Sequence, residues 1–136
     1  MRELRLPYPD AEQLFTRMVF NDIAKNNDDH TKNISFLMNK NGDWALSPAY
    51  DVTFSYNPTS MWLQRHQLSV NGKRENITEQ DLLFVARQMS IKKPDEIIEN
   101  VKETVNHWKN YAKECNIDKQ QTDYIEQIIH KSLCSA

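Results

Sequence analysis

Glycine is scarce in this chain, since only Gly42 and Gly72 occur among 136 residues. A loop that cradles phosphate groups needs several glycines, because its backbone must approach the phosphates closely and adopt conformations that side chains disfavour. The sequence therefore excludes a phosphate loop within these residues. If the chain handles a nucleotide, another segment must contact the phosphates.

The first glycine lies between two β-prone runs. Ile34–Met38 and Trp44–Ser47 flank the Asn41–Gly42 pair, which is a strong short-range signal for a β-hairpin. We therefore expect strands over these two runs, and Pro48 should end the pairing because it has no backbone N–H. The stretch 54–76 shows no clean period and is predicted to be irregular, with at most a short strand pair.

Helical periodicity dominates the remainder of the sequence. In the segment 10–26, apolar residues recur every three or four positions, which predicts a first helix. Asp10 follows Pro9 and is suited to cap the N-terminus of this helix. The helix should end near Asn26–Asn27, since Asn tolerates turn and C-terminal conformations.

A second helical region is predicted over residues 78–134, and it opens with the capping-box spacing of Thr78–Asp81. Pro94 suits the first turn of a long helix that continues to about Cys115. A last helix should run over Asp118–Leu133. The predicted fold class is therefore mainly α with a small β-hairpin.

Composition narrows the class of protein. With 39% hydrophobic and 26% charged residues, the chain has the composition of one soluble globular domain, residues 1–136. Its 17 basic and 19 acidic residues give a formal net charge of −2, which argues against direct nucleic-acid binding. The sequence has no apolar run long enough for a membrane span and no secretory leader, so we expect a cytoplasmic protein with Cys115 and Cys134 reduced.

The segment 26–36, NNDDHTKNISF, is a dense polar cluster between the first helix and the hairpin. Phosphoryl transfer needs a carboxylate facing the acceptor hydroxyl and oxygen ligands for the Mg²⁺ that bridges the nucleotide phosphates. In a kinase catalytic loop, the base Asp precedes a metal-binding Asn by five residues. Asp28 and Asn33 have this spacing, and the hairpin could return Asp51 to the same ion as Asn33.

Together these segments resemble the C-terminal part of the HipA-like serine/threonine kinases, the toxin kinases of bacterial toxin–antitoxin modules. The family pattern is roughly D-x-H-x-K-N, then a hydrophobic strand, a Gly-containing turn and L-[ST]-P-x-Y-D. The matching residues are Asp28, His30, Lys32, Asn33, Leu46, Ser47, Pro48, Tyr50 and Asp51. Residues 66–78 also resemble the family, so the likeness covers most of 11–90. It implies the helical C-terminal lobe of a protein-kinase-like fold, with a catalytic loop over 26–36 and a metal-Asp motif over 46–52.

The resemblance also implies roles for individual residues. Asp28 would be the catalytic base or would orient the acceptor hydroxyl. Asn33 and Asp51 would bind the Mg²⁺ that accompanies ATP, and Lys32 could face a phosphate as a point charge. His30 would either touch phosphate or brace the loop through a carbonyl.

The chain departs from the family pattern in two respects. Asp29 stands where many relatives carry a small residue. The nucleotide lobe, phosphate loop and phosphate-binding Lys of intact relatives are not found in these 136 residues. We therefore expect the chain alone to be inactive and to bind nucleotide no tighter than about millimolar.

The resemblance implies several partners. One is an N-terminal kinase lobe, in the same or a separate chain, and another is a helix-turn-helix antitoxin that represses the kinase. The protein substrate could be an aminoacyl-tRNA synthetase, with growth arrest and persistence as the outcome. Neither a nucleic acid nor a membrane is expected as a direct partner.

Three alternatives stay open. The polar loop could be an ordinary turn, because Asp and Asn cap helices and close turns. A zinc site could form from Asp28, His30 and Asp51, although such sites usually contain more His. The chain could also be a catalytically silent module that binds an antitoxin or a separate nucleotide lobe. The isolated histidines, interpreted as structural or exposed, are His66, His107 and His130.

Overall fold

A computed structural model describes residues 1–135 of the chain. In chain order, its elements are α1 (Tyr8–Ile23), the 3-10 turn η1 (Thr31–Asn33), β1 (Phe36–Met38), β2 (Trp44–Leu46), α2 (Glu79–Gln88), α3 (Pro94–Asn106), α4 (Trp108–Glu114) and α5 (Lys119–Ser135). Helices make up about half of the described residues and the two strands form a hairpin, which confirms the predicted fold class.

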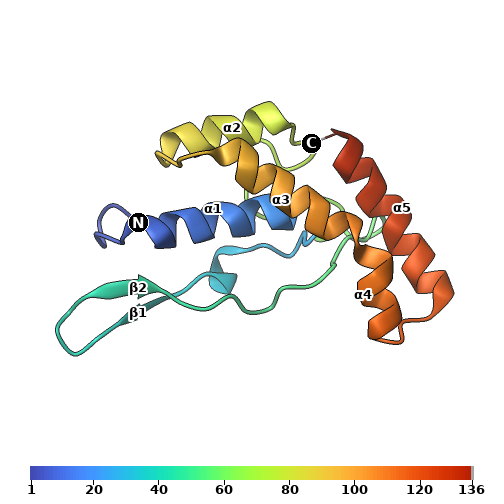
Figure 1. Cartoon of the computed structure of the whole chain (residues 1–136), viewed down its shortest axis with the longest axis horizontal. Helices are drawn as coiled ribbons and strands as arrows, with labels where there is room; N and C mark the ends of the chain where they lie inside the picture. The colour runs from blue at the N-terminus through green and yellow to red at the C-terminus, as the bar shows by residue number, and fades with distance from the viewer. Residues whose placement is uncertain (136) are drawn as a thin grey trace.

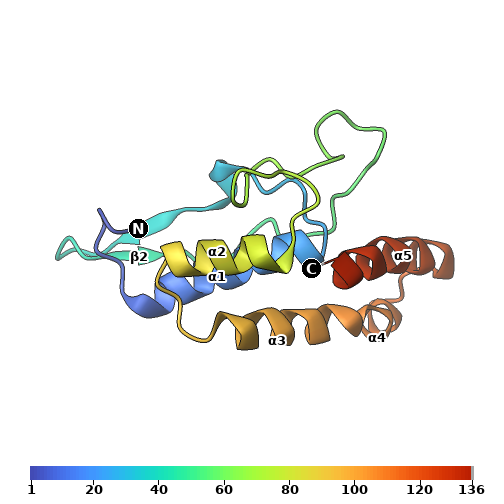
Figure 2. The same ribbon diagram turned by 90° about the horizontal axis from the view of Figure 1, so that it is seen from above.

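Helix α1 lies at the centre of the molecule. It is contacted by α3, α5 and β2, while α2 packs on α3 and α4 packs between α3 and α5. Figures 1 and 2 show α2 and α3 running alongside α1, α4 and α5 beyond its C-terminal end, and the hairpin projecting from the end at which α1 begins. The irregular segment between β2 and α2 runs back past the other end of α1.

The apolar core forms where the helices meet α1. Phe15, Val19 and Ile23 have no exposed surface and follow one another every four residues, so they share one face of α1. The residues that pack with them from other segments are Val70, Ile77, Leu82, Ala86, Ile91, Ile98, Val101, Val105, Ile125 and Ile129. The buried face reaches the last residue of α1, so the chain that follows starts from a fixed position.

The start of α1 differs from the prediction. The helix begins at Tyr8 with Pro7 as its N-cap, so Asp10 lies in the first turn and does not cap the helix. A carboxylate is still favourable there, because it lies near the positive end of the helix dipole. The Asp10 carboxylate also accepts a 2.9 Å hydrogen bond from the Leu46 N–H, which ties β2 to α1.

The scarcity of glycine is visible at the ends of three helices. Lys25, Ser90 and Asn116, which follow α1, α2 and α4, adopt the left-handed conformation with φ of 56°, 56° and 55°. Glycine is usual at such positions. In each case the next residue's N–H bonds to the carbonyl five positions earlier and closes the turn. α1 therefore ends at Ile23, and the prediction that it ends near Asn26–Asn27 is wrong.

The hairpin confirms the predicted turn with shorter strands. β1 and β2 are antiparallel, with Phe36 opposite Leu46, and Gly42 in the turn has a φ of 84°. Leu37 and Met38 remain 57% and 59% exposed, so the strands pack little against the helices. The stretch 54–76 is irregular as predicted, with one isolated β-bridge between Val70 and Lys73.

The predicted capping box is present at the start of α2. The Thr78 N–H donates a 2.9 Å hydrogen bond to the Asp81 carboxylate, which also lies 2.7 Å from the Lys73 ammonium. The Lys73 charge, with hydrogen bonds from Thr78 and Asn71, holds the pKa of Asp81 well below its usual range. The helix start is therefore fixed by a charged group as well as by a backbone cap.

The prediction of one long helix from Pro94 to about Cys115 is wrong. α3 ends at Asn106 and α4 begins at Trp108, with His107 between them at φ −84° and ψ 13°. The Trp108 indole N–H donates a 3.0 Å hydrogen bond to the Thr122 carbonyl of α5. The break allows α4 to pack on α5 as well as on α3. The last helix, α5, confirms the prediction.

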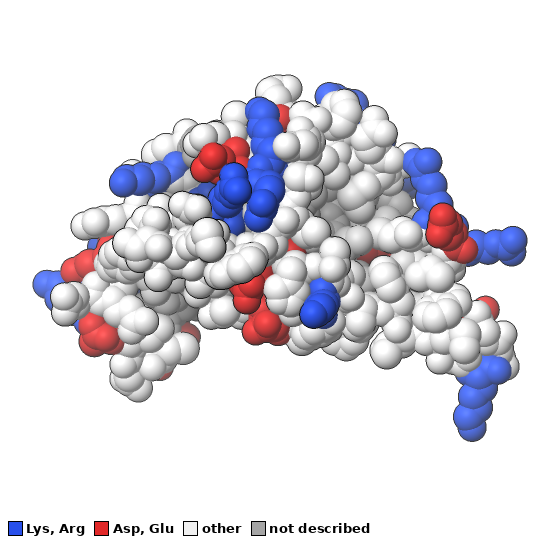
Figure 3. All heavy atoms as spheres, turned by 180° about the vertical axis from the view of Figure 1, so that it is seen from behind, with Lys and Arg blue, Asp and Glu red and all other residues white. Residues whose placement is uncertain are grey.

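The surface of the described residues carries both signs of charge. The face shown in Figure 3 carries small groups of Lys and Arg and of Asp and Glu, with wide uncharged areas between them. Cys115 and Cys134 are exposed and form no disulfide with each other, and their reduced state stays a prediction. None of the helices in the described part is both long and apolar enough to cross a membrane.

Candidate active site

The polar loop follows α1 directly, and buried side chains hold its beginning in place. Asn26 and Asn27 are 3% and 2% exposed. Asn26 donates to the Asn21 side chain and accepts from the Ser55 hydroxyl, both at 3.0 Å. Asn27 donates a 3.0 Å hydrogen bond to the Leu63 carbonyl. These side chains replace the backbone hydrogen bonds that a helix or strand would supply to a buried segment.

Asp29 holds the middle of the loop against the segment 66–68. It is 8% exposed, and its carboxylate accepts hydrogen bonds from the Gln67 N–H at 2.7 Å and the Leu68 N–H at 3.3 Å. Its other oxygen lies 3.0 Å from Nδ1 of His66. The departure from the family pattern at this position is therefore a buried anchor and not a surface charge.

His66 is buried between two carboxylates. Its Nε2 atom lies 3.5 Å from Oδ1 of Asp22, on the side opposite Asp29. Burial alone would lower the pKa of His66, but the hydrogen bonds and charges of Asp22 and Asp29 outweigh it and raise that pKa. Of the two predicted alternatives for His66, structural or exposed, the structural one holds, because the residue is only 3% exposed.

The backbone of Asp28 is fixed on both sides, while its carboxylate is accessible. The Asp28 N–H donates to the Ser55 hydroxyl, and the Asn33 amide donates to the Asp28 carbonyl, both at 3.0 Å. The Asp28 side chain is 47% exposed, and its carboxylate lies 3.9 Å from Nε2 of His30. A carboxylate held in this way can meet a group that approaches from outside.

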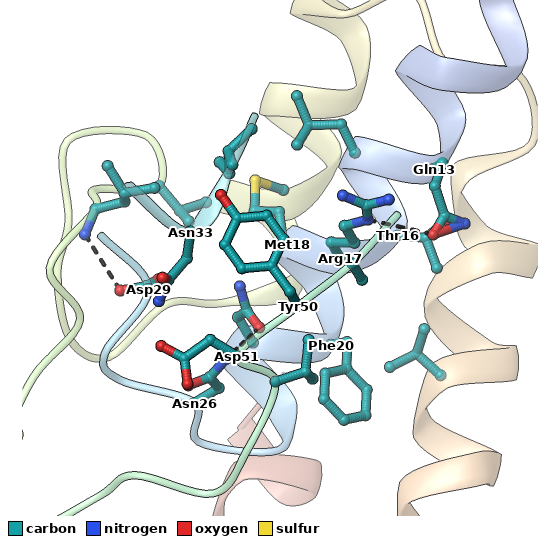
Figure 4. Close-up of a pocket in the computed structure, with 18 of the residues that line it drawn as sticks. Gln13, Thr16, Arg17, Met18, Phe20, Asn26, Asp29, Asn33, Tyr50 and Asp51 are labelled. Carbon is teal, nitrogen blue, oxygen red and sulfur yellow. Dashed lines mark hydrogen bonds between the residues drawn. The ribbon is translucent and has the colours of Figure 1, made fainter. Parts of the chain in front are cut away.

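A cavity of about 680 Å³ adjoins the loop, and both predicted metal ligands line it. Asn33 enters from η1, while Asp51 and Tyr50 enter from the segment after β2 (Figure 4). His30, from the polar loop, also lines the cavity. Asp51 has a φ of 53° and is exposed. The hairpin thus returns Asp51 to the cavity that Asn33 reaches, whereas Asp28 lies beside this cavity and not in its lining.

The remaining residues of the predicted motifs hold the site together. The Tyr50 hydroxyl donates a 2.7 Å hydrogen bond to the Lys32 carbonyl, which joins the segment before Asp51 to η1. The Ser47 hydroxyl accepts a 2.9 Å hydrogen bond from the Ser35 hydroxyl across the base of the hairpin. The Lys32 side chain is exposed and does not line the cavity. Its predicted contact with phosphate therefore stays a prediction.

The comparison with protein families agrees with this arrangement. A model of the HipA-like C-terminal domain matches residues 1–132. The chain belongs to this family. A comparison with curated proteins gave no match. Membership in the HipA-like family supports a toxin–antitoxin context and a relationship to kinases.

The ligand atoms that Asn33 and Asp51 offer at the cavity are oxygens. Among the described residues, no group of three or more His, Cys, Asp and Glu side chains is placed to hold a metal ion. This finding argues against the zinc site of Asp28, His30 and Asp51. A Mg²⁺ site needs only one or two carboxylates, because this ion keeps several water ligands.

Sequence reasoning missed the residues that support the loop of the HipA-like domain. Asn26 and Asn27 belong to the quoted polar segment, but their buried role could not be read from it. Ser55 and His66 are far from the loop in the sequence, and only the fold brings them to it. The one available signal for His66 was its position at the start of the family-like segment 66–78.

Proposed function

We propose that this HipA-like domain is the catalytic and metal-binding lobe of a bacterial serine/threonine protein kinase. It would transfer the γ-phosphate of ATP to a protein hydroxyl, as the toxin of a toxin–antitoxin module. The observation that carries the proposal is the convergence of Asn33 and Asp51 on one cavity, beside the loop in which Asn33 holds the Asp28 backbone. Family membership supports the same class of reaction.

The residues at the cavity fit Mg²⁺. The Asn33 amide uses its nitrogen on the Asp28 carbonyl, so its oxygen is the atom that remains for a cation. Asp51 contributes an exposed carboxylate. One amide oxygen and one carboxylate are a typical protein contribution to a Mg²⁺ site. Bound there, the ion would neutralise negative charge on the phosphates of ATP.

Asp28 is the residue proposed to face the acceptor. Its carboxylate would accept the proton of a Ser or Thr hydroxyl while that oxygen forms a bond to the γ-phosphorus. The bond between the γ-phosphorus and the bridging oxygen breaks in the same step, and ADP leaves with that oxygen. The hydrogen bonds to the Asp28 backbone fix its position in the loop, and the 47% exposed side chain would be open to an approaching hydroxyl.

The contacts to the nucleotide phosphates must come from elsewhere, because the chain has only two glycines. We propose that an N-terminal kinase lobe, in the same or a separate chain, supplies them. A helix-turn-helix antitoxin and a protein substrate such as an aminoacyl-tRNA synthetase complete the proposed partners, in the cytoplasm. The chain alone would then be inactive.

Metal binding can be tested on the chain itself with Mn²⁺, which broadens the NMR signals of nearby nuclei. We expect the amides of residues 28–33 and 50–52 to broaden first and to recover when Mg²⁺ is added in excess. Asp51→Ala should remove this selective broadening. Asp95 is an exposed carboxylate at the start of α3, and Asp95→Ala should leave the broadening unchanged. Selective broadening that survives in Asp51→Ala would reject the metal assignment.

Phosphoryl transfer needs the missing phosphate contacts. The chain is therefore combined with the protein segment encoded immediately upstream, with Mg²⁺ and labelled ATP, and incorporation of label into protein is measured. We expect Asp28→Ala and Asp51→Ala to abolish incorporation and Asp95→Ala to leave it unchanged. If the two alanine variants incorporate as much label as the parent, the catalytic assignment is wrong.

A catalytically silent binding module is the second candidate function. It is favoured by the scarcity of glycine and by Met61 and Trp62, which are 76% and 68% exposed on the irregular segment. Exposed large apolar residues of this kind are typical of protein contacts. Binding of an antitoxin that Met61→Ser and Trp62→Ser weaken, without any label incorporation by the parent, would favour this candidate.

A further inference from the structure

A buried ion cluster joins three segments behind the candidate active site. Asp22 belongs to α1, Asp29 to the polar loop, and His66 to the segment that the loop packs against. The three residues are 3%, 8% and 3% exposed. Nδ1 of His66 lies 3.0 Å from the Asp29 carboxylate, and Nε2 lies 3.5 Å from the Asp22 carboxylate.

The geometry of this cluster favours a protonated ring. A neutral imidazole carries one N–H, so one of its two nitrogens would present a lone pair to a carboxylate. An imidazolium carries an N–H on both nitrogens. Its Nδ1–H then donates to the Asp29 carboxylate, and its Nε2–H faces the Asp22 carboxylate at ion-pair distance without a hydrogen bond. Burial opposes the charged ring, but the bonds and charges of Asp22 and Asp29 raise the pKa of His66 in spite of it.

Two cations adjoin the cluster, and both bind groups other than the His66 ring. The Lys25 ammonium lies 3.7 Å from the Asp22 carboxylate, and Arg74 donates to the His66 carbonyl at 2.5 Å. From α5, the Ser132 hydroxyl donates to the Asp22 carbonyl at 3.2 Å. Asp22 thus has a second cation beside it. The other partners of the Asp29 carboxylate are the backbone N–H groups of the segment 66–68, so its charge depends most on His66.

We propose that protonated His66 is a positioning residue: it draws Asp29 against the segment 66–68 and thereby sets the adjacent Asp28, and loss of its proton loosens the loop. The catalytic meaning of this device rests on the proposed function, because Asp28 is the residue that would face the acceptor hydroxyl. The claim that protonated His66 holds the loop in place is purely structural, and it can be tested without measuring any enzymatic activity.

The state of the ring can be measured by NMR on the parent chain. We expect both nitrogens of His66 to be protonated at neutral pH, and its titration midpoint to lie above the ordinary histidine value of about 6.5. The amides of residues 27–30 should shift with the same midpoint as His66. A neutral His66 ring at pH 7, or loop amides that do not follow its titration, would overturn the proposal.

Asp29→Asn gives a sharper test than removal of His66, which is buried and whose loss could prevent folding. Its amide oxygen can still accept from the Gln67 and Leu68 N–H groups, because both bonds end on the same Asp29 oxygen. Its amide nitrogen would face Nδ1 of His66 and favour the neutral ring. The His66 midpoint should therefore fall by about one pH unit or more.

Asp95→Asn removes a carboxylate from the exposed first turn of α3 and is the matched control for charge. It should leave the His66 midpoint and the loop shifts unchanged. If Asp29→Asn also leaves the His66 midpoint unchanged, the ring is not held by Asp29 and the proposal fails. A loop that stays in the parent position after the midpoint has fallen would equally contradict the positioning role.

The loop test and the test of the proposed function have independent outcomes, so either proposal can be rejected while the other holds. If Mn²⁺ finds no selective site and no phosphoryl transfer occurs, the His66-linked shift of the loop still shows the positioning device. If transfer occurs, the same device predicts that its rate falls as pH rises through the His66 midpoint. In Asp29→Asn, the pH profile should move to lower pH together with that midpoint.

Discussion

The polar loop and the hairpin follow one another in the sequence, but they are held in opposite ways. The loop is fixed from inside by Asn26, Asn27 and Asp29, which are all buried. The hairpin projects from the helices, and its strands expose Leu37 and Met38. It is tied at its base, where the Asp10 carboxylate accepts from the Leu46 N–H.

This difference separates two tasks within one site. The loop must present Asp28 and Asn33 in a fixed position, and a buried polar network gives a unique arrangement because each partner is needed. The hairpin must only reverse the chain, so that Asp51 comes back to the cavity. We therefore expect changes in the loop to cost much stability and changes in the outer hairpin to cost little.

The largest contrast is expected between Asp29→Ala and Asp43→Ala. Asp29→Ala leaves the buried His66 ring and the Gln67 N–H without their partner, and breaking a buried ion pair from one side costs about 3–5 kcal/mol. Asp43 in the hairpin turn accepts an exposed 3.0 Å bond from Asn39, and its loss should cost roughly 1 kcal/mol or less. Urea unfolding measures both values. Equal losses in the two variants would show that the loop is not held from inside.

The second expected effect is a dependence of stability on pH that arises in the loop cluster. The folded-state pKa of His66 is raised, so its contribution is fully present below the unfolded-state pKa of about 6.5. The contribution is lost as pH rises through the folded-state pKa, by about 1.4 kcal/mol for each unit between the two pKa values. The free energy of unfolding should therefore fall on the alkaline side of neutrality.

Unfolding in urea at a series of pH values measures this effect. Asp29→Asn serves as the reference, because the contribution of His66 to stability is weaker in this variant. The difference in stability between the parent and Asp29→Asn should shrink as pH rises from about 6 to 9. The hairpin contains no histidine, so Asp43→Ala should keep the pH dependence of the parent. A difference that grows with pH would contradict the sign of the proposed linkage.

The two regions also differ in how far their sequence predicts them. The hairpin is local: Asn41 and Gly42 specify its turn, and the strands need only each other to pair. The likeness of the 28–33 and 46–51 segments to the family indicated that Asn33 and Asp51 belong to one site, and the hairpin brings both to one cavity. The roles of these residues stay predictions.

The supports of the loop were not predictable in the same way. Asp29 meets His66, and Asn27 meets the Leu63 carbonyl, across more than thirty residues of chain that include the hairpin. No period or spacing encodes such pairs, because they depend on the path of the stretch 54–76. The errors at the two ends of α1 have other origins. Asp10 lies inside the helix and binds the Leu46 N–H, and the helix ends early because a left-handed Lys25 closes it locally.

A third, smaller effect concerns the base of the hairpin. Asp10→Ala removes the acceptor for the Leu46 N–H and should cost about 1 kcal/mol, since this hydrogen bond is only partly buried. Exchange of the Leu46 amide with solvent should become faster, while the loop amides 26–30 keep their protection. Glu12→Ala, which removes a partly exposed acidic side chain from the same part of α1, is the control. Faster exchange throughout the loop would show that the hairpin and the loop are held as one unit.

The smallest expected effect is that of Gly42→Ala at the tip of the hairpin. Gly42 has a φ of 84°, a conformation that alanine disfavours, but an added Cβ would meet nothing within 4 Å. The cost is therefore one of backbone conformation alone, about 1 kcal/mol. Chemical shifts should change from Asn39 to Trp44 and not in the loop, and Lys40→Ala in the same turn should cost less. A larger loss, or shifts that reach Asp28, would mean that the turn conformation also positions the active-site loop.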